Sequence, residues 1–218
     1  MAAKQTITGT VCGGYEPGAV PGAVRGLARR EPAGAWRPEW QDVRMATNQP
    51  WSGFPGDLLT AKELVYDAVG FVCTPPVPEP ESAEYAAHGF TLDGLAVRFR
   101  IAKTTPTKTG QFVTVWQRSV EGPIRPFDAE DGVDLVVISS RDSGYFGQFV
   151  FPRAVLCERG IMSRAGAGGK RGFRVYPPWV TTTSRQADRT QRWQGEYFLP
   201  LDEGKPLDVA RARVLYHP

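Results

Sequence analysis

The chain has 218 residues, of which 41% are hydrophobic, 22% charged and 11% aromatic, with a formal net charge of +3. This composition is that of one soluble globular domain with an appendage, and it argues against a fibre, a coiled coil or a fully disordered chain. The longest apolar stretch, around Leu135 to Ile138, is far shorter than the roughly 18 residues of a membrane-spanning helix, and the N-terminus carries no signal-peptide apolar region. We therefore expect a cytoplasmic protein with no membrane partner.

The first third of the chain divides into an extension and a helix. Residues 1–44 mix Gly, Pro, Ala and Arg without helical or strand periodicity, so they cannot bury enough apolar surface to offset the entropy of ordering. We expect residues 1–47 to be a disordered or dispensable extension and residues 48–218 to form the folded domain. Asp57 is placed to cap a helix that ends at Gly70. The apolar stripe of this helix consists of Leu58, Ala61, Val65, Ala68 and Val69.

Strand-like segments dominate the middle of the chain. After an extended Pro-rich connector at 74–82, segments 87–92 and 95–102 flank Asp93-Gly94 and predict a hairpin whose outer face carries Arg98 and Arg100. Further strands are predicted at 111–118, 133–138, 145–151 and 173–176. A final helix is predicted to start at 182–184 and to run to about Phe198. Helix, strands and helix together predict the α/β class, as an α+β arrangement with a mixed sheet.

Charge is unevenly distributed along the sequence. Segment 57–93 contains seven acidic residues against one base, Lys62. Segment 98–118 contains five bases and no acid, and segment 159–193 contains eight bases against Asp188. A concentrated positive field favours polyanionic partners, although a run of bases is also typical of an ordinary solvated face.

Common catalytic arrangements find little support. Cys12, Cys73 and Cys157 lie far apart without CxxC spacing, and His88 and His217 are the only histidines, so neither a zinc cage nor a Ser-His-Asp or Cys-His site is indicated. The loop GAGGKRG lacks the spacing of a phosphate-binding loop, which favours a flexible turn. A group of carboxylates around the predicted strand at 133–138 has the donors for a divalent cation, or is a solvated loop; its members are Asp128, Glu130, Asp131 and Asp134.

The predicted final helix is more informative. Arg185, Arg189 and Arg192 recur at i, i+4 and i+7 and therefore share one face. Aromatic residues interleave with these bases: Tyr176 and Trp179 precede the helix and Trp193 lies on it. Arginines that neutralise phosphates and rings on which bases stack are typical of single-strand binding, although such rings can also belong to the core.

At this point the sequence resembles the MepB family, which is known from bacteria. The resemblance rests on the segments PESAEY, FRIAKTTPTKTGQFVTVWQR, GPIRPFD, YFGQFVFPRAVLCERGI, KRGFRVYPPW and TSRQADRTQRWQ. It spans residues 57–199 and leaves out residues 1–44. It implies a restriction-endonuclease-like core, related to PD-(D/E)XK enzymes and flanked by helices, which binds nucleic acid rather than cutting it.

The residues themselves allow a check on cutting. PD-(D/E)XK chemistry needs an aspartate on one strand and an acid-x-lysine on the next, so that two carboxylates hold Mg²⁺ and the lysine polarises the water. The natural placement here is Asp134 with Gln148 and Val150. Gln148 offers a carbonyl oxygen but Val150 cannot do the work of a lysine, which leaves Lys103 as a substitute, and Glu63 or Glu84 as added carboxylates. We therefore expect a degenerate nuclease site, with no metal and no cofactor; Mg²⁺ enters only under the nuclease alternative.

The sequence thus predicts a nucleic-acid-binding protein that is not an enzyme and that prefers RNA or single-stranded DNA, with duplex DNA bound more weakly. A metal-dependent nuclease using Asp134, Gln148 and Lys103, and a protein-interaction module using an acidic face at 57–93, stay open as alternatives. The predicted phosphate contacts are Lys103, Lys108, Arg118, Lys170, Arg171, Arg174, Arg185, Arg189 and Arg192. The predicted stacking surfaces are Tyr176, Trp179 and Trp193.

Overall fold

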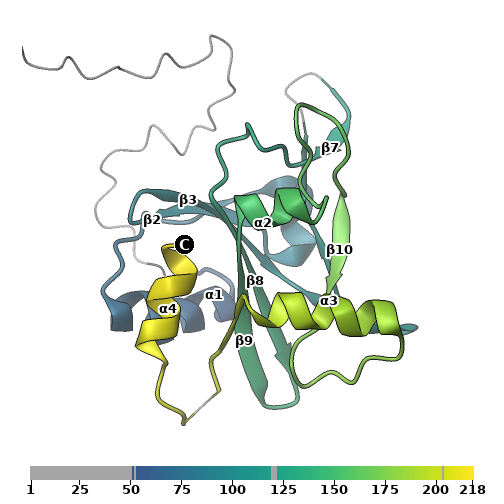
Figure 1. Cartoon of the computed structure of the whole chain (residues 1–218). Helices are drawn as coiled ribbons and strands as arrows, with labels where there is room; N and C mark the ends of the chain where they lie inside the picture. The colour runs from purple at the N-terminus through teal and green to yellow at the C-terminus, as the bar shows by residue number, and fades with distance from the viewer. Residues whose placement is uncertain (1–50, 52, 119–121, 203) are drawn as a thin grey trace, which may run out of the picture. The chain divides into compact units, whose positions relative to one another are not determined.

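A six-stranded mixed sheet forms the centre of the fold in the computed structural model, which describes residues 51, 53–118, 122–202 and 204–218 (Figure 1). The predicted extension at 1–47 lies outside the described residues. The strand order is β1-β2-β3-β8-β9-β11, in which β3 and β8 run parallel and every other pair is antiparallel. The strands are β1 Val77–Pro78, β2 His88–Leu92, β3 Leu95–Ile101, β8 Leu135–Asp142, β9 Tyr145–Pro152 and β11 Phe198–Pro200. The predicted mixed α+β fold class is confirmed.

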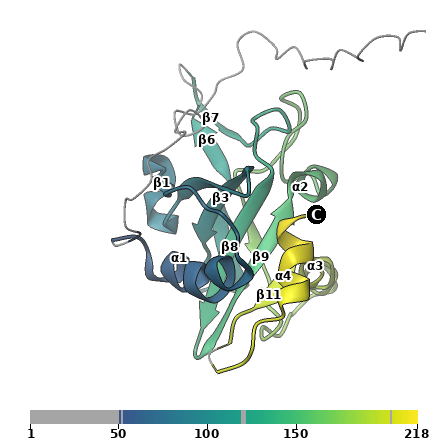
Figure 2. The same ribbon diagram turned by 90° about the vertical axis from the view of Figure 1, so that its left-hand side faces the viewer.

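Hydrophobic side chains project from both faces of this sheet and form two cores. Along β8, Leu135 and Val137 enter one core and Val136 and Ile138 enter the other. This is expected for a strand of consecutive apolar residues, because successive side chains point to opposite faces of the sheet. The first core contains residues of α1 (Gly56–Ala61) and α4 (Val209–Tyr216), which lie in front of the sheet in Figure 2. The second core lies on the side of α2 (Arg153–Glu158) and α3 (Arg185–Gly195).

The first helix differs in detail from its prediction. It starts at Gly56 without a side-chain cap, and Asp57 instead accepts a hydrogen bond from Nε of Arg141 at 2.9 Å. After α1 the chain continues as a π-helix, η2 (Lys62–Asp67), whose i to i+5 spacing shifts the buried stripe. Tyr66 is therefore buried and Ala68 is exposed, contrary to the 3.6-residue stripe.

The predicted hairpin is confirmed as β2 and β3, but the prediction that its basic face is the outer face is wrong. Arg98 and Arg100 are 3% and 0% exposed, and both donate to the carboxylate of Glu79. Burial alone raises the pKa of Glu79, but the charges of Arg100 and Arg98 and their hydrogen bonds outweigh it, so the pKa lies below its usual value. Burial lowers the pKa of Arg100, and Glu79 partly offsets that effect. The face is buried because a partner from the connector neutralises it, which strand periodicity cannot reveal.

The strand predicted at 111–118 divides between two smaller sheets. β5 (Lys108–Thr114) pairs with β4 (Lys103–Thr105) on one side and with β10 (Gly172–Val175) on the other. β6 (Trp116–Arg118) instead pairs with β7 (Ile124–Pro126). Val115, between β5 and β6, is buried in the second core and marks the break.

The C-terminal part contains two elements that were not predicted. α3 begins after Ser184, whose Oγ accepts a hydrogen bond from the backbone N of Ala187, as predicted, but it ends at Gly195. Phe198 belongs to β11, and α4 follows, capped by Asp208. The connector at 74–82 also contains β1 and the start of a 3-10 helix, η3 (Pro80–Tyr85). Within the described ranges, no helix is long and apolar enough to cross a membrane.

Candidate functional site

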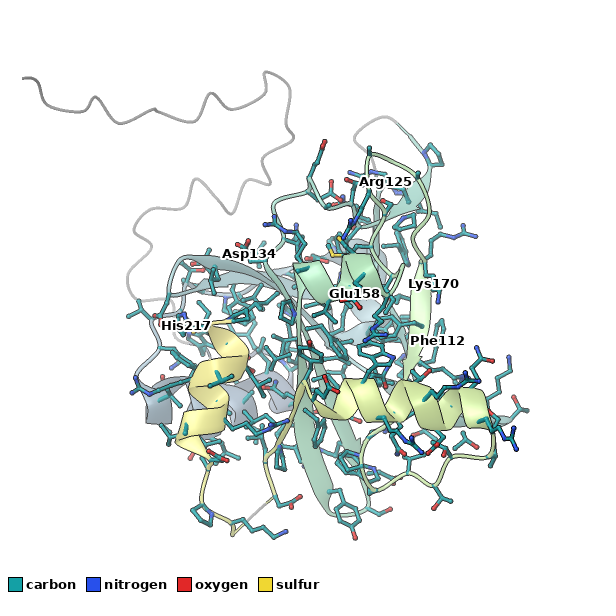
Figure 3. The ribbon with its side chains drawn as sticks, in the orientation of Figure 1. Phe112, Arg125, Asp134, Glu158, Lys170 and His217 are labelled. Atoms are coloured by element: carbon teal, nitrogen blue, oxygen red, sulfur yellow. The ribbon has the colours of Figure 1, made fainter. Side chains whose placement is uncertain are left out.

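A cavity of about 390 Å³ lies between α3, β10 and the residues that follow α2. Figure 3 places Lys170 beside β10, close to the end of α2. Three basic residues and three aromatic residues line the cavity, and its lining contains no carboxylate. The lining residues are Arg159, Ile161, Lys170, Gly172, Phe173, Arg174, Tyr176, Gln186, Thr190, Trp193 and Gln194.

One buried side chain joins the two walls of this cavity. Gln194 is fully buried on α3; its Nε2 donates to the backbone O of Arg174 at 2.9 Å and its Oε1 accepts from the backbone N of Tyr176 at 2.8 Å. Both ends of the amide are therefore satisfied by the edge of β10, which fixes the distance between strand and helix. This side chain therefore holds together the strand and the helix that line the cavity.

Two of the three aromatic side chains of the cavity, Trp193 and Tyr176, are held in different ways. Trp193 packs against Phe151, with ring centroids 5.4 Å apart, while the guanidinium of Arg159 lies over its ring at 5.2 Å. The ring of Tyr176 lies against Gly110, where a Cβ atom would sit 2.7 Å from Cδ1 of the ring. Gly110 also has φ +79°, so only glycine combines this backbone with this close approach. The site therefore depends on Gly110 and Arg159, which the sequence analysis did not select.

Arg174 connects the cavity to the turn between β4 and β5. Its Nη1 donates to the backbone O of Gly110 at 3.0 Å and its Nη2 to Oγ1 of Thr105 at 2.7 Å. Nη1 also lies 3.3 Å from the backbone O of Lys108, so the start of β5 lies next to Arg174. Arg174, predicted as a phosphate contact, thus has a positioning role in addition to any contact with an anion.

A row of side chains crosses the three-stranded sheet beside the cavity. Lys103 on β4 pairs with Phe112 on β5, and Phe112 pairs with Arg174 on β10. Directly paired residues share one face of a sheet, and adjacent strands lie about 4.8 Å apart, so two cations flank one half-buried ring within about 10 Å. Phe112 was not predicted to be functional, although its position between two predicted basic strands was a usable signal.

The three predicted arginines of α3 are exposed and lie beside the cavity. Gln186, Thr190 and Trp193 form the face of α3 that lines it. At about 100° per residue, Arg189 lies about 60° around the helix from Gln186, and Arg185 and Arg192 lie about 40–60° beyond it. Arg192 is paired with Asp188 at 2.8 Å, whereas the guanidinium of Arg189 reaches only the backbone O of Arg185.

The remaining predicted contacts are spread more widely. Lys170 and Arg171 are exposed at the end of the Gly-rich loop, and Arg118 is exposed on β6, in a separate two-stranded sheet. Trp179 is stacked on Tyr145 with ring centroids 5.4 Å apart, so one face of the indole is already covered. The structure therefore brings Lys170, Arg174, Tyr176 and Trp193 to one cavity, with the backbone of Lys108 next to Arg174 and the α3 arginines at the border.

The Gly-rich loop is exposed over residues 164–168, but hydrogen bonds to the acidic loop hold its first part. The carboxylate of Asp128 accepts hydrogen bonds from Oγ of Ser163 at 2.6 Å and from the backbone N of Gly166 at 2.9 Å. Burial alone raises the pKa of Asp128, but these hydrogen bonds outweigh it and the pKa is lowered. Asp131 is bonded to Arg125 at 2.6 Å, so these two carboxylates have structural partners. No cluster of three potential metal ligands occurs among the described residues.

The residues of the predicted degenerate nuclease site do not come together. Gln148 pairs with Ser139, whereas Asp134 precedes β8; at about 3.3 Å per residue the two positions are about 17 Å apart along the strand. Oε1 of Gln148 accepts from the hydroxyl of Tyr216 in the first core, while Lys103 lies over the ring of Tyr85 in the second. In Figure 3, Asp134 lies beside His217 at the far side of α2 from Lys170.

The acidic segment 57–93 does not form one acidic face. Asp57 is bonded to Arg141, Asp67 to Lys62 and Glu79 to the buried arginines. Asp93 accepts from Val72 N and lies 3.0 Å from Nε2 of His217. Most of these carboxylates therefore neutralise bases of the same domain.

Comparisons with a family model and with solved structures place the chain in a family. A MepB-like family model matches residues 79–200. A solved structure described as "Crystal Structure of MepB" has 35% sequence identity and a TM-score of 0.57, and the match covers 61% of this chain and 88% of that chain. No curated protein matches. The family model matches more than half of the 218 residues, and at 35% identity this chain covers 88% of the MepB structure, so the chain belongs to the MepB-like family.

Proposed function

We propose that this protein binds single-stranded nucleic acid, RNA or single-stranded DNA in preference to duplex, and does not cleave it. The observation that carries the proposal is the cavity at α3 and β10, whose lining combines three cations and three aromatic rings without a carboxylate. The exposed arginines of α3 extend the positive surface at its border. The resemblance to the MepB family implies the same class of ligand.

The chemistry of this surface matches an unpaired strand. Arginine and lysine neutralise phosphates and release condensed counterions, which supplies most of the sequence-independent affinity. Aromatic rings and guanidinium planes stack on bases at about 1–3 kcal/mol per base, but only where the base is not already paired and stacked in a duplex. The phosphates of a duplex can contact the cations, but its paired bases cannot stack on the aromatic rings. We therefore expect a duplex to bind more weakly.

The absence of cleavage is part of the proposal and rests on geometry. The three residues assigned to a degenerate nuclease site lie apart: Asp134 precedes β8, Gln148 is on β9 and Lys103 is on β4 of the three-stranded sheet. Val150, to which the sequence placement assigns the position of the catalytic lysine, is fully buried in the first core. The relationship of the fold to PD-(D/E)XK enzymes stays a prediction from the sequence resemblance.

The test is a salt titration of binding to labelled RNA, single-stranded DNA and duplex DNA of equal length, measured by fluorescence anisotropy. We expect the single strands to bind more tightly than the duplex, with log affinity falling linearly against log salt. The same oligonucleotides are then incubated with the protein and Mg²⁺ or Mn²⁺. No binding at low salt refutes the proposal. Cleavage that disappears in Asp134→Ala refutes its second part and favours the nuclease alternative.

A further inference from the structure

We propose that the cavity at α3 and β10 holds one nucleotide of the bound strand, with its base stacked over Arg159 and its phosphate on Lys170. The inference rests on the proposed function and adds a defined subsite to it. It concerns a nucleotide unit, that is, a base, a ribose and a phosphate, which must be unpaired to enter.

The size and composition of the cavity fit such a unit. Its volume of about 390 Å³ lies at the lower end of the roughly 300–1,000 Å³ of small-molecule sites. Three other cavities in the described part of the chain each include at least one carboxylate in their lining, namely Asp134, Glu79 with Glu81, and Glu63 with Asp202 and Asp208. Among these four cavities, the cavity at α3 and β10 is the one without a carboxylate, and its charge suits a phosphate.

The base position follows from the pair formed by Arg159 and Trp193. The guanidinium of Arg159 lies over the indole of Trp193 at 5.2 Å. The rings of Phe151 and Tyr197 also pack against this indole. The pair presents a flat cation on a rigid support, which is a surface on which an unpaired base stacks. Trp193 then acts as a positioning residue for Arg159 rather than as the stacking surface.

Polar groups at the same rim can meet the edge of the base. Gln186 is exposed on α3, and its amide has both donors and an acceptor. Thr190 donates its hydroxyl hydrogen to the backbone O of Gln186 at 2.9 Å, which leaves the hydroxyl oxygen as an acceptor. Gln194, in contrast, has both ends of its amide occupied by β10 and serves only as a wall.

The phosphate position follows from Lys170. Its backbone N donates to the backbone O of Ile161 at 2.9 Å, so the main chain is fixed while the side chain is exposed at the cavity. Arg174 is less suited, because its guanidinium already bonds to the β4–β5 turn. Arg189, at the border of the cavity face of α3, is placed to contact the next phosphate of the strand.

Two arginines of α2 and its C-terminal end provide a matched pair of variants. Arg153 and Arg159 each have a side chain that is 43% exposed, and each has one long ion pair, at 3.9 Å to Asp134 and at 3.8 Å to Glu158. Only Arg159 lines the proposed subsite; Arg153 lines the cavity that contains Asp134. Arg159→Gln and Arg153→Gln therefore remove the same charge from similar surroundings.

The experiment measures binding of AMP to the full chain by isothermal titration calorimetry, with ribose 5-phosphate as the probe that lacks a base. We expect one AMP per chain and binding of ribose 5-phosphate at least tenfold weaker. Arg159→Gln is expected to weaken AMP binding at least tenfold, and Arg153→Gln to leave it within twofold. A single-stranded oligonucleotide at saturation is expected to displace AMP, which separates a strand nucleotide from a free nucleotide as the occupant.

The outcomes separate this inference from the proposed function. If oligonucleotides bind but AMP does not, or if both arginine variants behave alike, the subsite is wrong and strand binding stands. If AMP and the oligonucleotide bind at the same time, the cavity is not occupied by the strand and the inference is overturned. If no oligonucleotide binds at low salt, the proposed function itself fails.

Discussion

The arginine stripe of α3 gives the sharpest prediction for strand binding, because its three members differ in the structure. Arg192 is already paired with Asp188 at 2.8 Å, while Arg185 and Arg189 have no carboxylate among the ion pairs of the described residues. An arginine whose charge is balanced by a neighbouring carboxylate releases fewer counterions when it meets a phosphate. The three positions, equivalent in sequence spacing, are therefore expected to contribute unequally to the salt dependence.

The expected sizes follow from counterion release. Each phosphate contact contributes about 0.7 to the slope of log affinity against log salt for a single strand. Replacing Arg185 and Arg189 together by Gln should therefore lower the slope by about 1.4, whereas Arg192→Gln alone should lower it by less than about 0.7. Asp188→Asn should change the slope in the opposite direction, since it releases Arg192 from its partner.

The assay is fluorescence anisotropy with a labelled homopolymeric single strand between about 50 and 200 mM salt. Folding of each variant is checked by thermal melting, which should change little because an exposed i, i+4 pair contributes only about 0.3–0.5 kcal/mol. Arg153→Gln, on α2 and away from the stripe, is the charge-matched control for Arg192→Gln. An unchanged slope in the double variant, or a steeper loss for Arg192→Gln than for the double variant, would refute the assignment of this face.

Three further predictions concern the framework of the site. Glu79→Gln should lower the free energy of unfolding by about 3–5 kcal/mol. Because folding lowers the pKa of Glu79, the wild type should lose this stability as the pH falls below about 4, whereas the variant should not. Urea unfolding at several pH values measures both effects. Gly110→Ala should push Tyr176 out of place and weaken strand binding, whereas Gly56→Ala, where a Cβ meets nothing within 4 Å, should not, as measured by anisotropy. Asp128→Asn should loosen the Gly-rich loop and speed its amide hydrogen exchange, and the wild type should show the same loosening as the pH falls through the lowered pKa of Asp128.

The sequence predicts local structure well where periodicity alone decides it. The hairpin of β2 and β3, the buried strand β8 and the capped start of α3 all follow from alternation or from a capping serine next to a helical pattern. Elements with weak local signals were missed. β11 is three residues long and α4 has a mixed composition, so both depend on tertiary contacts such as that of Tyr216 with Gln148.

The candidate site was predictable in part for the same reason. Lys170, Tyr176 and Trp193 lie in one basic, aromatic stretch, and the structure brings them to one cavity. Arg159 and Gly110 were not selected, because their roles depend on contacts with residues distant in sequence. Trp179 was selected for its surroundings in the sequence, but Tyr145, from the hairpin of β8 and β9, covers one face of its ring.

Charge shows most clearly how folding changes a reading of the sequence. In the sequence, the acidic segment 57–93 and the basic segment 98–118 look like two separate surfaces. In the structure, Glu79 forms ion pairs with Arg98 and Arg100, and Glu84 lies 3.8 Å from Lys103. Three of the five bases of segment 98–118 are thus paired with carboxylates of segment 57–93. The basic segment 159–193 has no such partner segment in the described residues, apart from single pairs such as Arg192 with Asp188. The net positive field therefore concentrates at α3 and its cavity, which is why a polyanion is expected there rather than on the hairpin whose sequence is equally basic.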